Sequence, residues 1–561
     1  MHLSRINWLG CVALTLSWLG YDHYRPWVNF HSEGLAMAGL GLLLLAQWTK
    51  ASGPWVVPRM GLWIGVAAGL PWLQYLGGLG LFAGDALMVS LYLLGLLGAV
   101  AVGYGSLMSA AATPARLHLA LLHGLWVAAL VSAAIGLAQW LMVQDRLAMY
   151  AVQTDVGDRA MGNLGQPNQL ATLLLMGMMA LTYVYQQKII GRLGWAMAMA
   201  FMTLVLVMTG SRAGMLGVLV LAAFLIWKSR REELGITSGD VVVWVLGFAL
   251  GHLLLPYLAE LLWGAGGGRS MESLTHTHDR WVIWQQIVQG ILAAPWVGYG
   301  WDQSAAAQMA GALVVPGEQP VTYAHNFVLD MLAWNGLPLG LLFTGAIAYW
   351  FVTRMTRVRG ATGVYAMAGL LPFAVHSMVE YPFAYAYFLL TAGLLIGMVE
   401  ACTPGLKVIK LSIWLGRSVL VVWMVVGSYL TVEYFSIEED FRVVRFENLK
   451  IGQTPAGYEQ PQIWMLSQMA ALLKALRFVP TPGMSAQSLE DLRHVAHRFP
   501  IGPVNLRYAM ALGLNDNPVG AELEMRLIRG LYGEAYYQRA KSTLRGYEKE
   551  KYPQLSAVEL P

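Results

Sequence analysis

The sequence has few charged residues and almost no cysteine. Asp, Glu, Lys and Arg make up 12% of its 561 residues, about half of the roughly 25% found in an average soluble protein. The chain has no Walker sequence, no paired-carboxylate metal motif and no acidic relay within an apolar segment, which argues against pumps and nucleotide-driven transport. Cys11 and Cys402 lie in or beside apolar segments and predict neither a disulfide nor a metal site.

Hydrophobic residues are abundant instead, at 57% of the chain, and they occur in long runs. An apolar block of roughly 17–25 residues is long enough to cross the core of a bilayer as a helix. Such blocks lie near residues 6–21, 34–49, 59–75, 84–107, 117–143, 168–186, 193–209, 213–228, 240–263, 326–352, 361–377, 383–401 and 411–431. The sequence therefore predicts an all-α polytopic membrane protein with about 13 transmembrane helices.

The positive charges of the short loops fall on alternate sides of this arrangement. Lys and Arg gather near residues 50–59, 116, 188–192, 228–231, 354–359 and 407–410. Basic loops stay in the cytoplasm, so the intervening loops should face outward. We expect residues 1–431 to form a domain in the bacterial inner membrane, with a periplasmic loop at about 264–325.

The tail, residues 432–561, is rich in charges of both signs and should form a small helical C-terminal domain. It lies in the periplasm if the number of spans is odd. Ser488 and Asp491 resemble a capping box ahead of one helix, and residues 521–544 predict another. The sequence leaves two roles open for the tail, packing on the membrane domain and contact with a protein partner.

Two polar clusters precede apolar blocks on the outer side. In the first, Arg159 is followed by Gln166 and Asn168, whose amides suit a sugar or phosphate ligand. The alternative is that Asn168 only caps the helix after Pro167. In the second, Arg212 follows a very short turn, where a guanidinium favours binding of an anion over snorkelling at the interface.

Two further clusters lie in or beside the long outer loop. Arg280 begins an amphipathic pattern that predicts a helix along the membrane surface, ending at Pro295. His325, followed by Asn326, is a candidate base for a hydroxyl, or a structural histidine. His276 and His278 lack a third ligand, so we expect no metal site.

The turn that contains His376, Glu380 and Tyr381 is a further candidate on the same side, with weaker support from the sequence. Glu380 would orient an arginine or the histidine, or pair with Arg212. Taken together, two arginines suit a diphosphate and a histidine suits a hydroxyl nucleophile.

The order of these motifs resembles the O-antigen ligase and polymerase superfamily. It comprises Arg-x-x-Gly-x-x-x-Gln-Pro-Asn at 159–168, Gly-Ser-Arg-Ala-Gly at 210–214, Arg-x-x-x-Trp at 280–284, Pro-Trp-Val-Gly-Tyr-Gly at 295–300 and His-Asn at 325–326. Within it, the Gln-Pro-Asn segment, the His-Ser-Met-Val-Glu-Tyr-Pro turn and the helical tail look most like the bacterial protein O-oligosaccharyltransferases of the PglL type.

This resemblance implies a GT-C-like ligase architecture and en bloc transfer of an oligosaccharide from undecaprenyl diphosphate to a Ser or Thr of a periplasmic protein such as a pilin. Arg212 and Arg280 would bind the diphosphate, and His325 would activate the acceptor. No metal, cofactor or nucleic acid is implied.

Three rival functions remain. An O-antigen ligase would use lipid A-core as acceptor, and a polymerase would build ladders of glycan. A flippase for the lipid-linked glycan would need polar residues through the membrane midplane, whereas the unusual charges here gather on one side.

Overall fold

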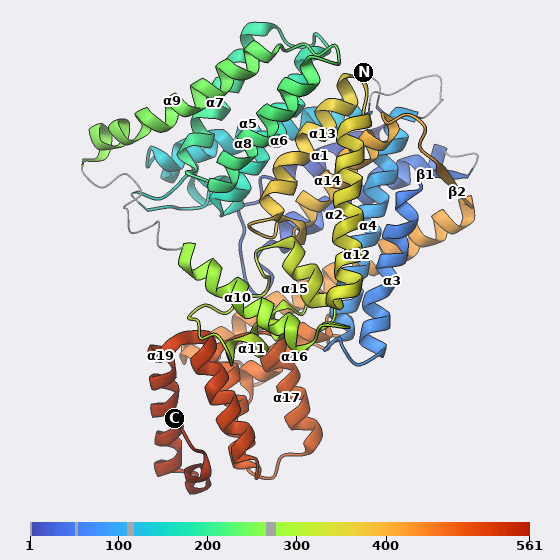
Figure 1. Ribbon diagram of the computed structural model, residues 1–561. Coiled ribbons are helices and arrows are strands. Elements are labelled where there is room, and N and C mark those ends of the chain that lie inside the picture. Colours follow the sequence, from blue (N-terminus) through green and yellow to red (C-terminus); the bar gives the residue numbers. More distant parts are fainter. Residues whose placement is uncertain (1–2, 51–53, 109–116, 156, 265–276, 561) are drawn as a thin grey trace. The chain divides into compact units, whose positions relative to one another are not determined.

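Nearly all of the regular structure is helical. The computed structural model of the protein describes residues 3–50, 54–108, 117–155, 157–264 and 277–560. These residues form nineteen α-helices and one two-stranded sheet (Figure 1). The all-α class predicted from the apolar blocks is confirmed. Arg116, His276 and the side chains of Lys50 and His278 lie outside the described residues.

Each apolar block of the sequence coincides with a helix. The helices are α1 Arg5–Leu16, α2 Phe30–Lys50, α3 Met60–Leu76, α4 Ala83–Met108, α5 Leu117–Trp140, α6 Pro167–Gln186, α7 Arg192–Met208, α8 Arg212–Ser229, α9 Ser238–Trp263, α12 Phe327–Arg357, α13 Gly360–Ser377, α14 Ala386–Ala401 and α15 Ile413–Leu449. Over the described residues, six of them (α4, α5, α8, α9, α12 and α15) are long and apolar enough to cross a membrane, and α1, α7 and α14 are apolar but shorter. The protein is thus a multi-pass membrane protein by the character of its helices, and thirteen spans stays a prediction.

The chain divides into two compact units. Unit 1 comprises Met1–Ala68, Leu91–Met271 and Ala348–Gly427. Unit 2 comprises Gly69–Ser90, Glu272–Ile347 and Ser428–Pro561. The C-terminal residues therefore share a unit with residues of the loop at 264–325 and with the residues that join α3 to α4.

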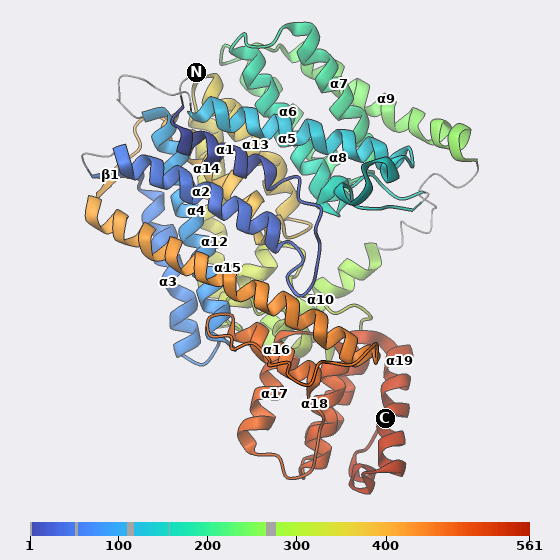
Figure 2. The same ribbon diagram turned by 180° about the vertical axis from the view of Figure 1, so that it is seen from behind.

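Helix α6 is the centre of unit 1. Every residue from Gln169 to Val184 is buried, as expected for a helix that is apolar all round. It is packed against α5, α7, α8 and α13, and Figures 1 and 2 show α5, α6 and α8 side by side. This packing fixes the position of the polar residues at the start of α6. A short antiparallel sheet of β1 (Trp55–Pro58) and β2 (Val408–Leu411) completes the unit.

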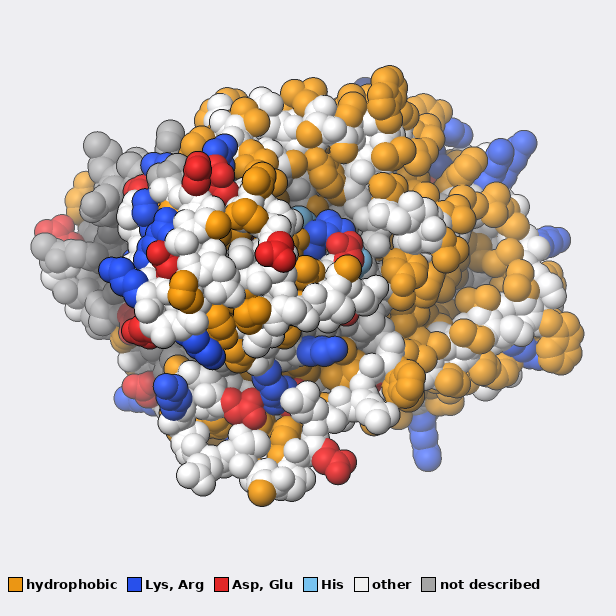
Figure 3. Space-filling model, turned by 90° about the horizontal axis from the view of Figure 1, so that it is seen from below, with side chains coloured by type: hydrophobic (Ala, Val, Ile, Leu, Met, Phe, Trp, Pro, Cys, Tyr) orange, Lys and Arg blue, Asp and Glu red, His pale blue; other side chains and the backbone are white. Residues whose placement is uncertain are grey.

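Helix α9 has an apolar surface that the protein leaves uncovered. Its exposed side chains include Leu246, Leu253 and Leu261, which are 62%, 67% and 81% exposed. An apolar surface of this kind on a long apolar helix is what contact with lipid requires. On the face drawn in Figure 3, charged side chains of both signs are interspersed among hydrophobic ones.

Unit 2 contains the helices of the loop at 264–325 and of the tail. The loop forms α10 (Thr277–Ala293), which confirms the helix predicted around Arg280, and α11 (Ser304–Ala312), which was not predicted. The tail forms α16 (Ser467–Arg477), α17 (Ala486–Arg498), α18 (Gly502–Leu514) and α19 (Pro518–Glu550), with α17 and α18 alongside each other in Figure 2. The helix predicted over residues 521–544 is confirmed as part of α19, which bends at Gly533, where φ is 77°.

One prediction about the tail was wrong. The N-cap of α17 is Ser485, not Ser488, because the Ser485 hydroxyl accepts a hydrogen bond from the Ser488 amide at 3.1 Å. Ser485 stands three residues before Ser488, and so offers the same capping geometry one turn earlier.

The tail helices pack on the loop helices. Met309 and Ala312 of α11 share a small buried cluster with Leu527 and Leu531 of α19. The backbone amide of Gly317 also donates to the carbonyl of Gly530 at 2.7 Å. The tail therefore packs within the protein, on the helices of the loop at 264–325, and contact with a protein partner stays a prediction.

Candidate functional site

The first group of candidate residues lies where α6 begins. Gln166 occupies the N-cap position of α6 but makes no capping hydrogen bond with its side chain. The Asn168 side chain instead accepts a hydrogen bond from the Ser211 hydroxyl at 2.6 Å and donates to a Glu380 carboxylate oxygen at 3.4 Å. The alternative that Asn168 caps its own helix is therefore wrong, and this amide joins three segments of unit 1.

Arg212 is the first residue of α8, directly after the N-cap Ser211. The Ser211 hydroxyl accepts from the amide of Gly214 at 2.9 Å, which fixes the start of this helix. Arg212 is half-buried, and within the described part of the chain its guanidinium has no hydrogen-bond or ion-pair partner. A helix start next to an uncompensated cation is a favourable place for an anion.

The end of α13 and the turn after it bring in the remaining residues of this group. His376 Nδ1 lies 2.9 Å from the hydroxyl of Thr172, one turn after Asn168 in α6. Glu380 is buried and its amide donates to the His376 carbonyl at 2.9 Å. The Tyr381 ring stacks on Tyr385, with centroids 5.8 Å apart.

Arg159 is held beside the turn between α7 and α8, which directly precedes Arg212. Its Nε donates to the carbonyl of Thr209 at 2.6 Å, just before Gly210, which takes a left-handed conformation with φ of 52°. The loop that carries Arg159 is tied to α5 by Gln139, whose buried amide bonds both the N–H and the C=O of Gly162 at 2.8 and 2.9 Å. Sequence reasoning missed Gln139, although an amide inside an apolar block was a usable signal.

The second group lies in unit 2, around the turn that carries His325. His325 has a φ of 53°, a conformation that side-chain-bearing residues seldom adopt and that the surrounding structure must hold in place. Asn326 caps α12, since its side-chain oxygen accepts from the Leu329 amide at 3.1 Å. The Trp284 indole of α10 donates to the carbonyl of Ala324 at 2.9 Å. Arg280 lies one turn earlier in α10, on the same face as Trp284.

Two carboxylates that sequence reasoning did not select lie beneath this turn. Asp330 accepts from the Ala324 amide at 2.8 Å and from the Ser304 hydroxyl at 2.5 Å. Asp302 forms a hydrogen bond with the Tyr323 hydroxyl, and burial raises the pKa of Asp302 to about 6. Burial also raises the pKa of Tyr323 well above its ordinary value. The His325 turn is therefore held by a buried polar network.

The ten predicted residues thus fall into two sets. The unit 1 set offers two arginines, two amides, a histidine, a tyrosine and a buried carboxylate; its members are Arg159, Gln166, Asn168, Arg212, His376, Glu380 and Tyr381. The unit 2 set offers a cation and a histidine on a constrained turn; its members are Arg280, His325 and Asn326. The first set suits an anion and a polar ligand, and the second suits transfer of a proton.

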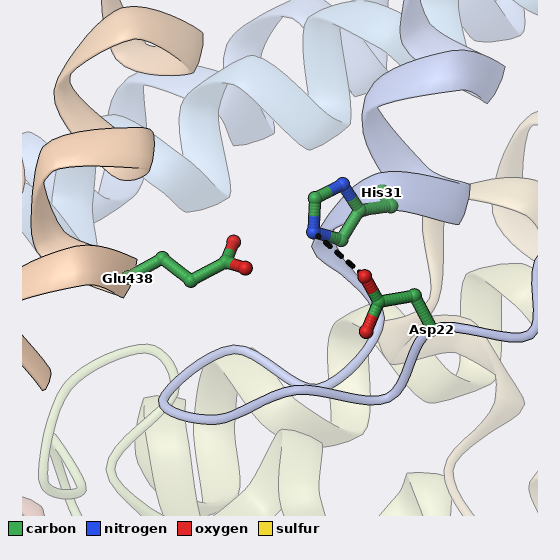
Figure 4. Close-up of side chains that lie close together, drawn as sticks. All are labelled: Asp22, His31 and Glu438. Carbon is green, nitrogen blue, oxygen red and sulfur yellow. Dashed lines mark ion pairs between the residues drawn. The ribbon is translucent and has the colours of Figure 1, made fainter. Parts of the chain in front are cut away.

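Another histidine of unit 1 has an acidic neighbour. His31, in the first turn of α2, points toward Asp22 with 3.5 Å between the imidazole and a carboxylate oxygen (Figure 4). Glu438, drawn in the same view, belongs to unit 2. A half-exposed pair of this kind contributes little to stability.

Three families match consecutive parts of the chain. Residues 160–184 match the family described as protein glycosylation ligase, residues 197–344 match O-antigen ligase, and residues 364–545 match the C-terminal part of virulence factor membrane-bound polymerase. The second of these segments contains Arg212, Arg280 and His325, and the first contains Asn168.

Two proteins of Acinetobacter baylyi (strain ATCC 33305 / BD413 / ADP1) are similar to the chain. One is named general O-oligosaccharyltransferase and is 28% identical over 540 residues, which cover 94% of the chain and 92% of that protein. The other is named ComP-specific O-oligosaccharyltransferase and is 29% identical over 247 residues, 43% of the chain and 44% of that protein. The chain is therefore a glycosyltransferase, and these matches support a protein O-oligosaccharyltransferase of the PglL type, which resembles the O-antigen ligases.

Proposed function

We propose that the protein transfers an oligosaccharide en bloc from undecaprenyl diphosphate to a Ser or Thr hydroxyl of a periplasmic protein such as a pilin. The proposal includes the location of the enzyme in the inner membrane, with its active site facing the periplasm. Its main support is Arg212, a half-buried cation at the start of α8 with no partner among the described residues. A guanidinium left uncompensated in a membrane protein is costly, and a phosphate ligand would offset that cost.

The reaction needs a base and a stabilised leaving group. His325 accepts the proton of the acceptor hydroxyl as its oxygen bonds to the anomeric carbon of the glycan. The bond from that carbon to the diphosphate oxygen breaks, and the diphosphate keeps the electron pair. Arg212 and Arg280 bind the diphosphate, whose negative charge grows as it leaves. A single displacement of this kind inverts the anomeric centre.

The other candidate residues support these groups. Asn168 joins the start of α8 to the buried Glu380, so the amide and the carboxylate hold the Arg212 turn. Asn326 fixes the start of α12 directly after His325. These residues position the groups that react and need not touch the substrate.

Acceptor type is tested by co-expression with a pilin and a lipid-linked oligosaccharide in cells that lack other ligases. We expect the intact pilin to gain the mass of one whole glycan, in a purified system also in the presence of EDTA. Glycan on lipid A-core with no mass change on the pilin would instead identify an O-antigen ligase, and ladders of repeats would identify a polymerase.

The same assay tests the base. Loss of a general base typically lowers a rate by about 10² to 10⁴-fold, so His325→Ala should reduce transfer by that factor and leave binding of the lipid-linked donor intact. His494→Ala is the control, because this histidine of α17 pairs with Glu490 away from the turn. Full activity of His325→Ala would remove His325 from the mechanism.

A further inference from the structure

The C-terminal helices contain an arginine that sequence reasoning passed over. The side chain of Arg498, the last residue of α17, is only 11% exposed. It donates to both carboxylate oxygens of Asp85, at 2.9 and 3.0 Å, and to Asp302 at 2.6 Å. All three residues belong to unit 2. A buried guanidinium that binds two carboxylates in a fork has a fixed position.

The second carboxylate, Asp302, connects Arg498 to the turn that carries His325. Asp302 forms a hydrogen bond with the hydroxyl of Tyr323, two residues before His325. Asp302 itself takes a φ of 65°, so its backbone is held in the left-handed region as that of His325 is. Polar contacts therefore run without a break from α17 to the segment that carries His325.

The other side of the turn is fixed by the chain next to Asp302. Ser304 begins α11 and donates to Asp330, which also binds the Ala324 amide. Trp334 donates to the Ser304 hydroxyl at 2.7 Å. Residues 302–304 thus hold the turn at Tyr323 and at Ala324, and Arg498 holds residue 302.

We propose that Arg498 is a positioning residue for glycan transfer, through which the C-terminal helices hold the His325 turn in its reactive conformation by way of Asp302 and Tyr323. The tail then contributes to the chemical step itself, beyond packing on the loop. This inference rests on the proposed role of His325 as base.

The alternative is an ion pair that serves stability alone. It predicts that loss of the pair lowers the melting temperature but leaves the turnover of each folded enzyme unchanged. A positioning role predicts that kcat falls while the KM for the lipid-linked donor stays the same, because a misplaced base affects the transition state and not donor binding.

Two mild variants separate these alternatives. Arg498→Lys keeps the charge but loses the fork, and Tyr323→Phe removes one hydroxyl and keeps the ring. Arg493→Lys is the matched control, since this arginine of α17 pairs with Glu490 at a half-exposed site and does not contact the turn. Transfer to a purified protein acceptor is measured with each full-length enzyme, together with its Tm.

We expect Tyr323→Phe and Arg498→Lys each to lower kcat at least tenfold, with donor KM within twofold of wild type and Arg493→Lys unchanged. The double variant should lose no more than about the larger single loss, because both changes break one chain of contacts. Wild-type kcat in both single variants, or losses that multiply in the double variant, would overturn the positioning role. A fully active His325→Ala would overturn the proposed base instead, so the two failures are distinguishable.

Discussion

Arg212 differs from most of the arginines of this protein in having no partner within the described residues. Arg354 pairs with Glu400, Arg477 with Asp440 and Arg192 with Asp240. Arg212 begins α8 directly after its serine cap, which binds the Asn168 amide, and it forms no ion pair with any carboxylate in the part of the chain that the structure describes. Its charge is available for a ligand, which makes it the residue whose replacement is most informative.

Replacement of Arg212 by Lys should weaken use of the lipid-linked donor. Lysine keeps the charge but cannot donate two parallel hydrogen bonds to phosphate oxygens. A charge-assisted hydrogen bond contributes about 1.5–3 kcal/mol, so we expect kcat/KM for the donor to fall by about 10- to 100-fold. Initial rates at several donor concentrations measure this.

Arg192→Lys is the control for that change, because its side chain is 74% exposed and makes a surface pair with Asp240. Its kinetics should match those of the unaltered enzyme. Equal donor use by Arg212→Lys and the wild type would show that Arg212 does not bind the diphosphate.

Among the elements of the fold, α8 shows how a cap can serve a site. Ser211 caps this helix and also donates to Asn168, so one hydroxyl fixes both the helix start and the amide that contacts Glu380. Ser485 caps α17 in the same way, at an exposed position far from any candidate residue in the sequence. A comparison of the two serines therefore separates the contribution of a cap to protein stability from its effect on activity.

We predict that Ser211→Ala and Ser485→Ala lower stability by similar small amounts, since loss of a serine cap costs about 1 kcal/mol. Only Ser211→Ala should lower glycan transfer, by about tenfold or more, because Asn168 and Arg212 lose their fixed geometry. Thermal unfolding in detergent and the transfer assay measure the two effects. Equal activity of both variants would mean that the cap matters for folding alone.

Local patterns in the sequence predicted the elements well and the network beneath the site poorly. Apolar blocks predicted thirteen helices, because burial of that many apolar residues in lipid requires helices. The block at 411–431 predicted the start of α15 but not its end, since that helix continues to Leu449. Short-range signals also placed Asn326 and Arg212 at helix starts. Asp302, Tyr323 and Arg498 gave no such signal, because Tyr323 is 21 positions from Asp302 and Arg498 is 196 and 413 positions from Asp302 and Asp85.

The sequence also did not predict the helix α11, and it predicted the wrong cap for α17. Residues 304–312 are short and rich in alanine, and only their packing against α10 and α19 identifies them as a helix of the core. Ser485 and Ser488 are both serines that can cap a helix, and the helix begins after the earlier of the two. The position of α11 thus depends on tertiary contacts, which the periodicity of the sequence does not predict.

At the scale of the whole molecule, the orientation in the membrane links the fold to the proposed reaction. The alternate placement of basic loops predicts that the loop at 144–166 faces the periplasm and the loop at 228–233 faces the cytoplasm. An odd number of spans before residue 432 then puts α19 in the periplasm. The packing of α19 on α11 within unit 2 agrees with an outer loop and a tail on the same side.

Single cysteines test this orientation, in a background with Cys11 and Cys402 replaced by Ser. The three variants are Gln153→Cys in the loop at 144–166, Val519→Cys in α19 and Glu233→Cys in the basic loop at 228–233. All three positions are exposed. In spheroplasts, a maleimide that does not cross membranes should label the first two, and Glu233→Cys only after permeabilisation. Labelling of Val519→Cys only after permeabilisation would indicate an even number of spans. The same result for Gln153→Cys would put Arg159 and Asn168 on the cytoplasmic side, where a periplasmic acceptor could not reach them.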